Sequence, residues 1–393
     1  MRNNWLFVII FLLVTKISVA QSYIWNGAVS TDFQVAANWT PARTAVTITD
    51  TLLFNAVLPI NIINVANQTI GALRIASGTN TVTLSSNLPT NTLILNNTVP
   101  LIFTTAGRIE AGDFLTIQLG VASSFTITSG VFGIAPGRGG KLRINGALTI
   151  AGGTLDIDVP GTGGAVINGP AGSITYNSGT FLCNRAASII WAANSNYYHG
   201  INGSAPSMIP AATWQAGSTC SITGMGSGTF APTGFANINF SNLTWNCPAQ
   251  SGTVNLLPAG SLININGTFT IAATGVSNRE LRLSTGKTTV RTASYLQTGG
   301  ILTLEAGADT ATLTVAGDFS HTGGVFNGVA GAAAGTALID LRGNVSRGAN
   351  ATWQSSGTNI AAQVIYQFSG TGVQSVNVAQ GTWSAPVGGG QVY

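Results

Sequence analysis

The stretch from Ala311 to Phe326, ATLTVAGDFSHTGGVF, decides the fold that the sequence predicts. Leu313 and Val315 alternate with small and polar residues, and a period of two is the pattern of a half-buried β-strand. Gly317 interrupts the alternation, Phe319 is the next large apolar residue, and the pair Gly323-Gly324 interrupts it again before Phe326. The unit is therefore a strand, a glycine, a second strand and a glycine corner that ends in an aromatic residue.

The same corner recurs along the chain as a small residue, a glycine, any residue and a large apolar residue. By subtraction, consecutive corner glycines are 23, 26, 49, 24, 48 and 24 residues apart, which is one or two steps of about 24. A fixed period in this range predicts a solenoid. The leucine-rich repeat pattern is absent, and no segment has helical periodicity over three turns. The corner glycines are Gly130, Gly153, Gly179, Gly228, Gly252, Gly300 and Gly324.

The composition supports strands and tight turns. The chain is 45% hydrophobic and only 7% charged, so it has enough apolar material to form a core and is not disordered through excess charge. Thr, Val, Ile, Leu, Asn and Gly dominate, which suits strands and corners. The net charge is +4, and +2 (13 basic minus 11 acidic residues) without Arg2 and Lys16 of the leader described below. Because no basic patch is present, we expect no nucleic-acid partner.

The sequence thus predicts an all-β protein, a single-stranded right-handed parallel β-helix (solenoid) of about a dozen rungs with a period of about 24 residues. A single rung buries too little apolar surface to offset the entropy of ordering its chain, so rungs are stable only when stacked. The pattern continues from about Thr47 without a change in composition, so residues 47–393 are predicted to form one β-helix repeat domain. The sequence stops at PVGGGQVY without a recognisable sorting domain, so we expect a truncation at the C-terminus.

Residues 1–20 are predicted to be a secretory signal peptide. Arg2 supplies a positive charge, an unbroken apolar run of ten residues follows, and small residues at positions 18 and 20 place the cut after Ala20. The run is too short to span a bilayer; the alternative is a buried core strand. We therefore expect an extracellular or cell-surface protein without a membrane span in the mature chain.

Residues 21–46 contain the densest aromatic cluster near either end, with Trp25, Phe33 and Trp39. The order W-N-G, D-F, A-A-N-W-x-P and then D-x-L-x-F resembles the first segment of secreted bacterial parallel β-helix surface proteins, both autotransporter-passenger-like and gliding-bacterium adhesin-like. The resemblance implies a structural or adhesive role at a cell surface. We expect the aromatic residues to form an N-terminal cap, because bare strand edges invite association. The alternative is an aromatic platform for sugars.

Later segments resemble the same family: W-x-x-G-S-T-C, then N-x-T-W-N-C-P, and F-x-G-x-x-x-Q-x-V near the end. They contain Cys220 and Cys247, which are 27 residues apart, about one rung. A disulfide between adjacent rungs is predicted for an exported chain, beside the alternative of two free buried thiols. Cys183 is expected to be buried, and the absence of C-x-x-C disfavours a zinc site.

Residues 183–210 have few alternations and are predicted to form a longer loop beside the rod. Trp191, Tyr197 and Tyr198 in this segment are the candidate ligand-binding residues, since exposed aromatic side chains stack on sugar rings and loops often carry function. Surface glycans would be the partners. The alternative is that these rings simply pack over the side of the rod.

Catalysis is not predicted, although parallel β-helices host polysaccharide lyases and hydrolases. Those reactions need clustered carboxylates, a Ca²⁺ site or a positioned base. The one close acidic pair, Asp156 and Asp158, is expected to face solvent, and neither His199 nor His321 is expected to have a catalytic acid or nucleophile as its partner. His321 is expected on the surface. We predict no catalytic residue, cofactor or metal site; a lyase or hydrolase remains the less favoured alternative.

Two short motifs predict a modification. Asp50-Thr51-Leu52 and Asp309-Thr310-Ala311 match the pattern of Asp, then Ser or Thr, then an aliphatic residue, which resembles the O-glycosylation motif of some gliding bacteria. Thr51 and Thr310 are therefore candidate sites. Together, the sequence predicts a non-catalytic, secreted, adhesin-like β-helix protein, with a polysaccharide-binding module as the alternative.

Overall fold

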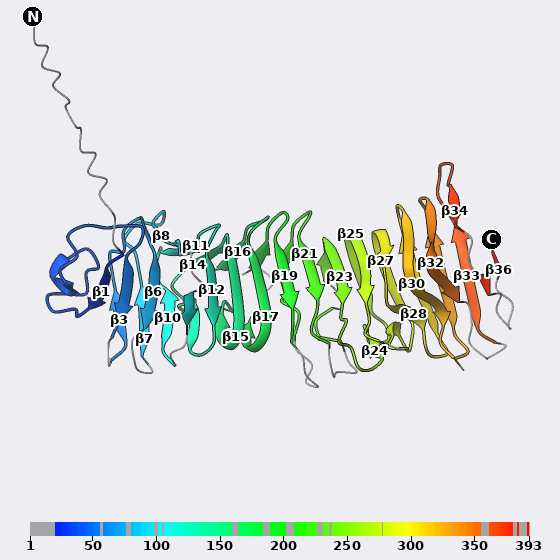
Figure 1. Cartoon of the computed structure of the whole chain (residues 1–393), viewed down its shortest axis with the longest axis horizontal. Helices are drawn as coiled ribbons and strands as arrows, with labels where there is room; N and C mark the ends of the chain where they lie inside the picture. Colours follow the sequence, from blue (N-terminus) through cyan, green and yellow to red (C-terminus); the bar gives the residue numbers. More distant parts are fainter. Residues whose placement is uncertain are drawn as a thin grey trace, which may run out of the picture.

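The chain forms a long column of stacked β-strands in a computed structural model (Figure 1). The structure describes residues 20–55, 58–75, 80–97, 101–103, 106–158, 164–183, 189–201, 208–225, 231–235, 238–276, 278–331, 333–354, 361–379, 383–384 and 391–392. It is a parallel β-solenoid of about 12 turns with a period of about 25 residues, 54% strand and without α-helices in the part described. The predicted fold class is confirmed, and the predicted signal peptide lies outside the described residues except for Ala20.

Three sheets run along the column. The first caps the N-terminal end and contains β1 (Ser22–Trp25), β2 (Trp39–Thr40), β3 (Thr51–Phe54) and β6 (Ala72–Ile75); the one-turn 3-10 helix Ala36–Asn38 precedes β2. The second contains β5 (Gln68–Ile70), β8 (Thr92–Leu95), β11 (Thr116–Leu119), β14 (Lys141–Ile144), β16 (Gly164–Ile167), β18 (Ile189–Trp191) and β20 (Thr213–Trp214).

The third sheet continues over the whole length, with 25 strands. Its members in the N-terminal half are β4 (Ile60–Ile62), β7 (Thr81–Leu84), β9 (Leu101–Phe103), β10 (Arg108–Ala111), β12 (Ser124–Ile127), β13 (Val131–Ile134), β15 (Ala147–Asp156), β17 (Ser173–Leu182) and β19 (Asn196–His199). Its middle members are β21 (Thr219–Ile222), β22 (Asn239–Phe240), β23 (Asn242–Asn246), β24 (Val254–Asn255), β25 (Leu262–Ala273), β26 (Leu281–Ser284), β27 (Thr288–Gln297) and β28 (Ile301–Glu305). The last are β29 (Thr310–Val315), β30 (Phe319–Val329), β31 (Thr336–Leu341), β32 (Val345–Gln354), β33 (Gln363–Phe368), β34 (Val376–Val378), β35 (Trp383–Ser384) and β36 (Gln391–Val392).

Alternation decides which side chains fill the column. In β29, Leu313 and Val315 are fully buried, while Thr312 and Thr314 are half-buried on the outer face. Equivalent positions of consecutive coils lie in register, so inward side chains form files. In one such file the rings of Tyr295 and Phe319 stack with centroids 4.7 Å apart at 20°. Each coil therefore completes the core of its neighbours, as the stacking argument requires.

Corner glycines occupy positions where a side chain has no room. Gly130, Gly179, Gly300 and Gly324 all have φ between 68° and 88°, in the left-handed region that favours glycine. Gly324 also lies directly over Gly300 of the preceding coil, because Val325 N donates to the Gly300 carbonyl at 2.8 Å. The register of the residues that follow them also aligns Gly130, Gly153 and Gly179 on three consecutive coils, so corner glycines form files. Gly153 and Gly252, however, do not have a left-handed φ, and Gly228 lies outside the described residues.

The N-terminal segment closes one end of the column (Figure 1). The strand β1 pairs in parallel with β3 and antiparallel with β2, so the chain turns back over its own first coil. Trp25, Phe33 and Trp39 are buried there, and Trp39 contacts the other two edge-on with centroids 4.9 and 5.1 Å away. These rings serve as core packing rather than as an exposed platform.

Within the described residues, the structure contains no helix with the length and apolar character needed to cross a bilayer.

Candidate functional site

The predicted glycan-stacking residues do not form an exposed platform, so that prediction is wrong for two of the three. Trp191 lies on β18 and Tyr197 on β19, and both are fully buried. The ring of Trp191 stacks on that of Trp214 in the next coil, with centroids 5.0 Å apart. Only Tyr198 is exposed, because it is the outward residue between two inward ones. The predicted lateral loop is therefore wrong over β18 and β19, which continue the column.

The three cysteines are free thiols, so the predicted Cys220–Cys247 disulfide is wrong for this structure. Strand register puts Cys220 opposite Leu243, four residues before Cys247. At about 3.3 Å per residue, the Cα atoms of the two cysteines are on the order of 13 Å apart along the strands, beyond the reach of a disulfide. Burial raises the pKa of all three thiols, to about 12 for Cys183 and Cys247. Cys183 is buried, as expected.

The candidate glycosylation residues begin two strands and are half-buried. Thr51 starts β3 and Thr310 starts β29. Their preceding aspartates differ, because Asp50 is fully buried in an ion pair whereas Asp309 is exposed. Of the two motifs, the one at Thr310 is therefore the more accessible in the folded chain, and modification of either residue stays a prediction.

Both histidines point into the column, and the expectation of a surface His321 is wrong. Trp353 Nε1 donates to His321 Nδ1 at 2.7 Å, and His199 Nδ1 lies 2.8 Å from the Tyr197 hydroxyl. Burial lowers the pKa of each histidine to about 4. The inward file thus keeps both imidazoles neutral near pH 7.

The acidic pair is also less exposed than predicted. Asp156 accepts from Arg108 Nη2 at 3.0 Å, and its side chain is only 14% exposed; Asp158 is half-buried. Arg108 also forms an ion pair with Glu110 on its own strand. Register shows how the arginine reaches so far, since Gly133 of the intervening coil lies between Glu110 and Asp156. The arginine therefore clamps three consecutive coils together across a glycine.

A pocket beside the N-terminal segment combines burial, charge and polar groups in one place. Its volume is about 510 Å³, and three stretches of chain line it. The first stretch, Phe33 and Gln34, precedes the 3-10 helix, and the second, the connection into β3, contributes Arg43, Thr44, Val46 and Ile48. The third consists of Ala66 and Asn67, which precede β5, and of Gln68 and Thr69, with which β5 begins.

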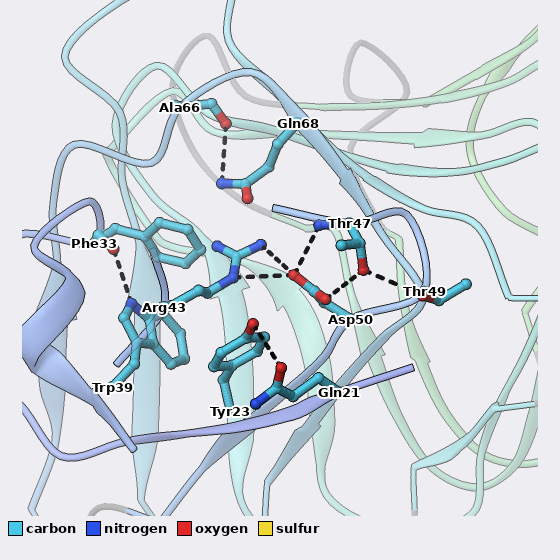
Figure 2. Close-up of polar contacts among 10 residues, drawn as sticks. All are labelled: Gln21, Tyr23, Phe33, Trp39, Arg43, Thr47, Thr49, Asp50, Ala66 and Gln68. Atoms are coloured by element: carbon cyan, nitrogen blue, oxygen red, sulfur yellow. Dashed lines mark hydrogen bonds and ion pairs between the residues drawn. The ribbon is translucent and has the colours of Figure 1, made fainter. Parts of the chain in front are cut away.

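Arg43, drawn in Figure 2, is the charged group of this pocket. Its side chain is only 4% exposed. Its Nε and Nη2 donate to Asp50 Oδ2 at 3.3 and 3.1 Å. Its Cζ lies 5.6–5.8 Å from the ring centroids of Tyr23, Phe33 and Trp39. An ion pair and three aromatic rings therefore fix the guanidinium, which supplies cation–π attraction in addition to the charge pairing.

Asp50 is held equally firmly from its other side. Thr47 donates to it twice, from N to Oδ2 at 3.0 Å and from Oγ1 to Oδ1 at 2.5 Å (Figure 2). Asp50 also anchors the next coil, because its carbonyl accepts from the N–H groups of Gly71 and Ala72. The Arg43–Asp50 pair therefore joins the cap segment to the first two coils.

Two polar atoms at the pocket are without a partner in the described part of the chain. The hydrogen bonds of the Arg43 side chain come from Nε and Nη2, so Nη1 has no partner among the described residues. In Figure 2 it is the guanidinium nitrogen without a dashed line. Among the described residues, no group donates a hydrogen bond to the buried Gln68 Oε1, and the one hydrogen bond of the side-chain amide is the 3.5 Å bond from Nε2 to the Ala66 carbonyl. No motif of the sequence predicts this site. Its one signal is that Arg43 is the sole basic residue of the aromatic-rich segment 21–46.

Comparison with protein-family models, characterised proteins and solved structures finds no match to this chain.

Proposed function

We propose that the protein is a non-catalytic, secreted rod that acts as a structural or adhesin-like element at a bacterial cell surface. The observation that carries this proposal is the continuous stack of about 12 coils, in which one sheet of 25 strands runs from end to end. Such a column is stiff because every inner coil pairs with two neighbours, and it presents the same outer faces repeatedly. The family resemblance of the N-terminal and cysteine-containing segments supports the surface location.

The use of the charged residues supports a scaffold role. At least six of the eleven Asp and Glu side chains form ion pairs with arginine, and the Arg108 clamp ties three coils together. Carboxylates engaged in this way are not poised as general acids or bases, which need a matched pKa and a reachable substrate. Both histidines are buried and neutral, so they favour a core role over proton transfer.

Deletion of the gene in the producing bacterium tests the proposal. We expect adhesion of the cells to fall and to return when the full chain is supplied, while the purified chain releases no reducing sugar from polysaccharides. Unchanged adhesion, or release of sugar by the purified chain, would contradict the non-catalytic surface role. Detection of the mature chain at the cell surface by antibody is the accompanying control for export.

A further inference from the structure

We propose that the pocket beside Arg43 binds a neutral, hydroxyl-rich ligand, one sugar ring at the end or branch of a glycan. The proposal adds a ligand to the rod and depends on the proposed function only for the source of that glycan. It rests on the size of the pocket, the balance of its charges and the pair of polar atoms that lack partners.

The size and walls of the pocket suit a sugar ring. A volume of about 510 Å³ lies within the range of about 300–1,000 Å³ for small-molecule sites. Phe33, Val46, Ile48 and Ala66 supply apolar surface, while the remaining lining residues are polar. Val46 and Ile48 are 55% and 59% exposed although both are aliphatic and only two residues apart. A sugar has an apolar C–H face and a rim of hydroxyls, and this pocket offers a counterpart to each.

The charges of the pocket favour an uncharged ligand. Arg43 is the one charged residue that lines it, and Asp50 neutralises that charge at 3.1 Å. A ligand carboxylate or phosphate would have to compete with Asp50, which two bonds from Thr47 hold in place. A neutral hydroxyl needs no change in the ion pair, because it accepts from the nitrogen that Asp50 leaves unused.

The two atoms without partners have complementary chemistry. Arg43 Nη1 can only donate, whereas Gln68 Oε1 can only accept. A hydroxyl group does both, so one sugar hydroxyl, or two adjacent ones, would accept from Arg43 and donate to Gln68. The Gln68 amide would turn about its last torsion, which has a broad energy profile, and would give up only its 3.5 Å bond to the Ala66 carbonyl.

The guanidinium is already in place for such a contact. Because the ion pair and three rings hold Arg43, binding would not require this side chain to lose further conformational freedom. Gln68 is the side chain that would be ordered. The contribution of each residue can therefore be measured separately.

The test uses the full mature chain and named probes: the methyl glycosides of glucose, galactose and mannose, with the methyl glycosides of glucuronate, galacturonate and mannuronate as charged counterparts. Ligand-observed NMR identifies binders, and calorimetric titration gives Kd. We expect at least one neutral glycoside to bind with Kd of about 1 mM or tighter. The matching uronate should bind at least about ten-fold more weakly, a difference of 1.4 kcal/mol.

Three variants locate the binding. Gln68→Met keeps the length of the side chain but removes the acceptor, and Ile48→Asp replaces an exposed apolar wall without touching the core. Each should weaken the bound glycoside about ten-fold or more. Val276→Asp changes a valine that is 77% exposed on a distant coil, and it should leave Kd unchanged. Because Ile48 is exposed, its variant keeps the test valid even if Gln68→Met disturbs folding.

Three results would overturn the proposal: no neutral glycoside binds, the uronates bind as tightly as the neutral sugars, or Ile48→Asp binds like the unmodified chain. None of these results alters the adhesion measurement on which the rod function depends. Conversely, unchanged adhesion in the deletion strain with intact glycoside binding would remove the surface role and keep the pocket.

Discussion

Replacement of Gly324 by alanine tests whether the corner file determines the fold. Gly324 has φ +85°, and a Cβ built on it would lie 2.6 Å from the Gly299 carbonyl carbon and 2.8 Å from the Gly299 oxygen. It would come closer still to the Gly300 oxygen, which accepts the hydrogen bond that joins the two coils. These contacts are with backbone, so neighbouring side chains cannot relieve them by changing rotamer. The coil of Gly324 must shift away from the coil below it.

At Gly324 an alanine would have both backbone strain and steric overlap, and the same substitution at Gly137 measures the backbone strain alone. The left-handed backbone costs an alanine about 1–2 kcal/mol, and forcing a methyl group into a filled site costs about 1–3 kcal/mol more. Gly137 has a similar φ of +72° but no heavy atom within 4 Å of its added Cβ. Gly137→Ala should therefore lower the free energy of unfolding by about 1–2 kcal/mol, and Gly324→Ala by about 2–5 kcal/mol.

Urea unfolding of both variants, followed by circular dichroism and tryptophan fluorescence, measures the difference. Because a repeat array can unfold in parts, the two probes are compared before any free energy is assigned. Hydrogen exchange supplies a local reading, and Gly324→Ala should raise exchange rates in β28 and β30 first. If Gly324→Ala is no more destabilising than Gly137→Ala, the close stacking at the corner does not control stability and the reasoning fails.

Three further predictions concern the interior and the clamps. The two buried histidines have a pKa of about 6.5 in the unfolded chain and of about 4 in the folded chain. Their contribution to the free energy of unfolding should therefore be fully present above pH 6.5 and should decline as the pH falls toward 4. The urea midpoint measured against pH should show this decline, and His199→Gln should make it less steep. The three thiols should resist iodoacetamide at pH 8 in the native chain and react after unfolding, whereas mass spectrometry that finds a disulfide would contradict the free thiols. Arg108→Met should lower the free energy of unfolding by about 1 kcal/mol, with the loss reduced at high salt; a loss independent of salt would argue against the clamp.

The architecture was predictable because it depends on local, repeated signals. Alternation identified the inward residues of β29, and the glycine spacing gave a period of about 24 residues against about 25 in the structure. The segment from β18 to β19 was misread because its aromatic residues suggested a binding loop. The alternation of Tyr197, Tyr198 and His199 is itself the pattern of a strand, in which Tyr198 faces outward and its two neighbours face the core.

The pocket was not predictable, because its parts come together only through the turn of the first coils. Phe33, Arg43 and Gln68 are separated by up to 35 residues (68 minus 33) and belong to no common repeat position. The prediction of a Cys220–Cys247 disulfide was wrong for a related reason. A spacing of 27 residues fits one coil, but strand register then sets the two cysteines four residues apart along the strand direction.

Arg347 provides a last prediction, because its charge is the least compensated in the described column. The residue is 2% exposed, and in the part of the chain that the structure describes none of its three guanidinium nitrogens has a hydrogen-bond partner. All eleven acidic residues belong to that part, and no ion pair there includes Arg347. An unpaired buried charge is strongly unfavourable, so the inward file should be more stable with an apolar side chain of similar length.

Arg347→Met should therefore raise the free energy of unfolding by at least about 1 kcal/mol. The matched control is Arg342→Met, at an arginine that is 52% exposed and paired with Asp340, where the change should be a loss of about 0–1 kcal/mol. Urea unfolding of the two variants under the same conditions decides between them. If Arg347→Met instead destabilises the chain by about 3–5 kcal/mol, the guanidinium has a charged partner in solution, since that is the cost of breaking a buried pair.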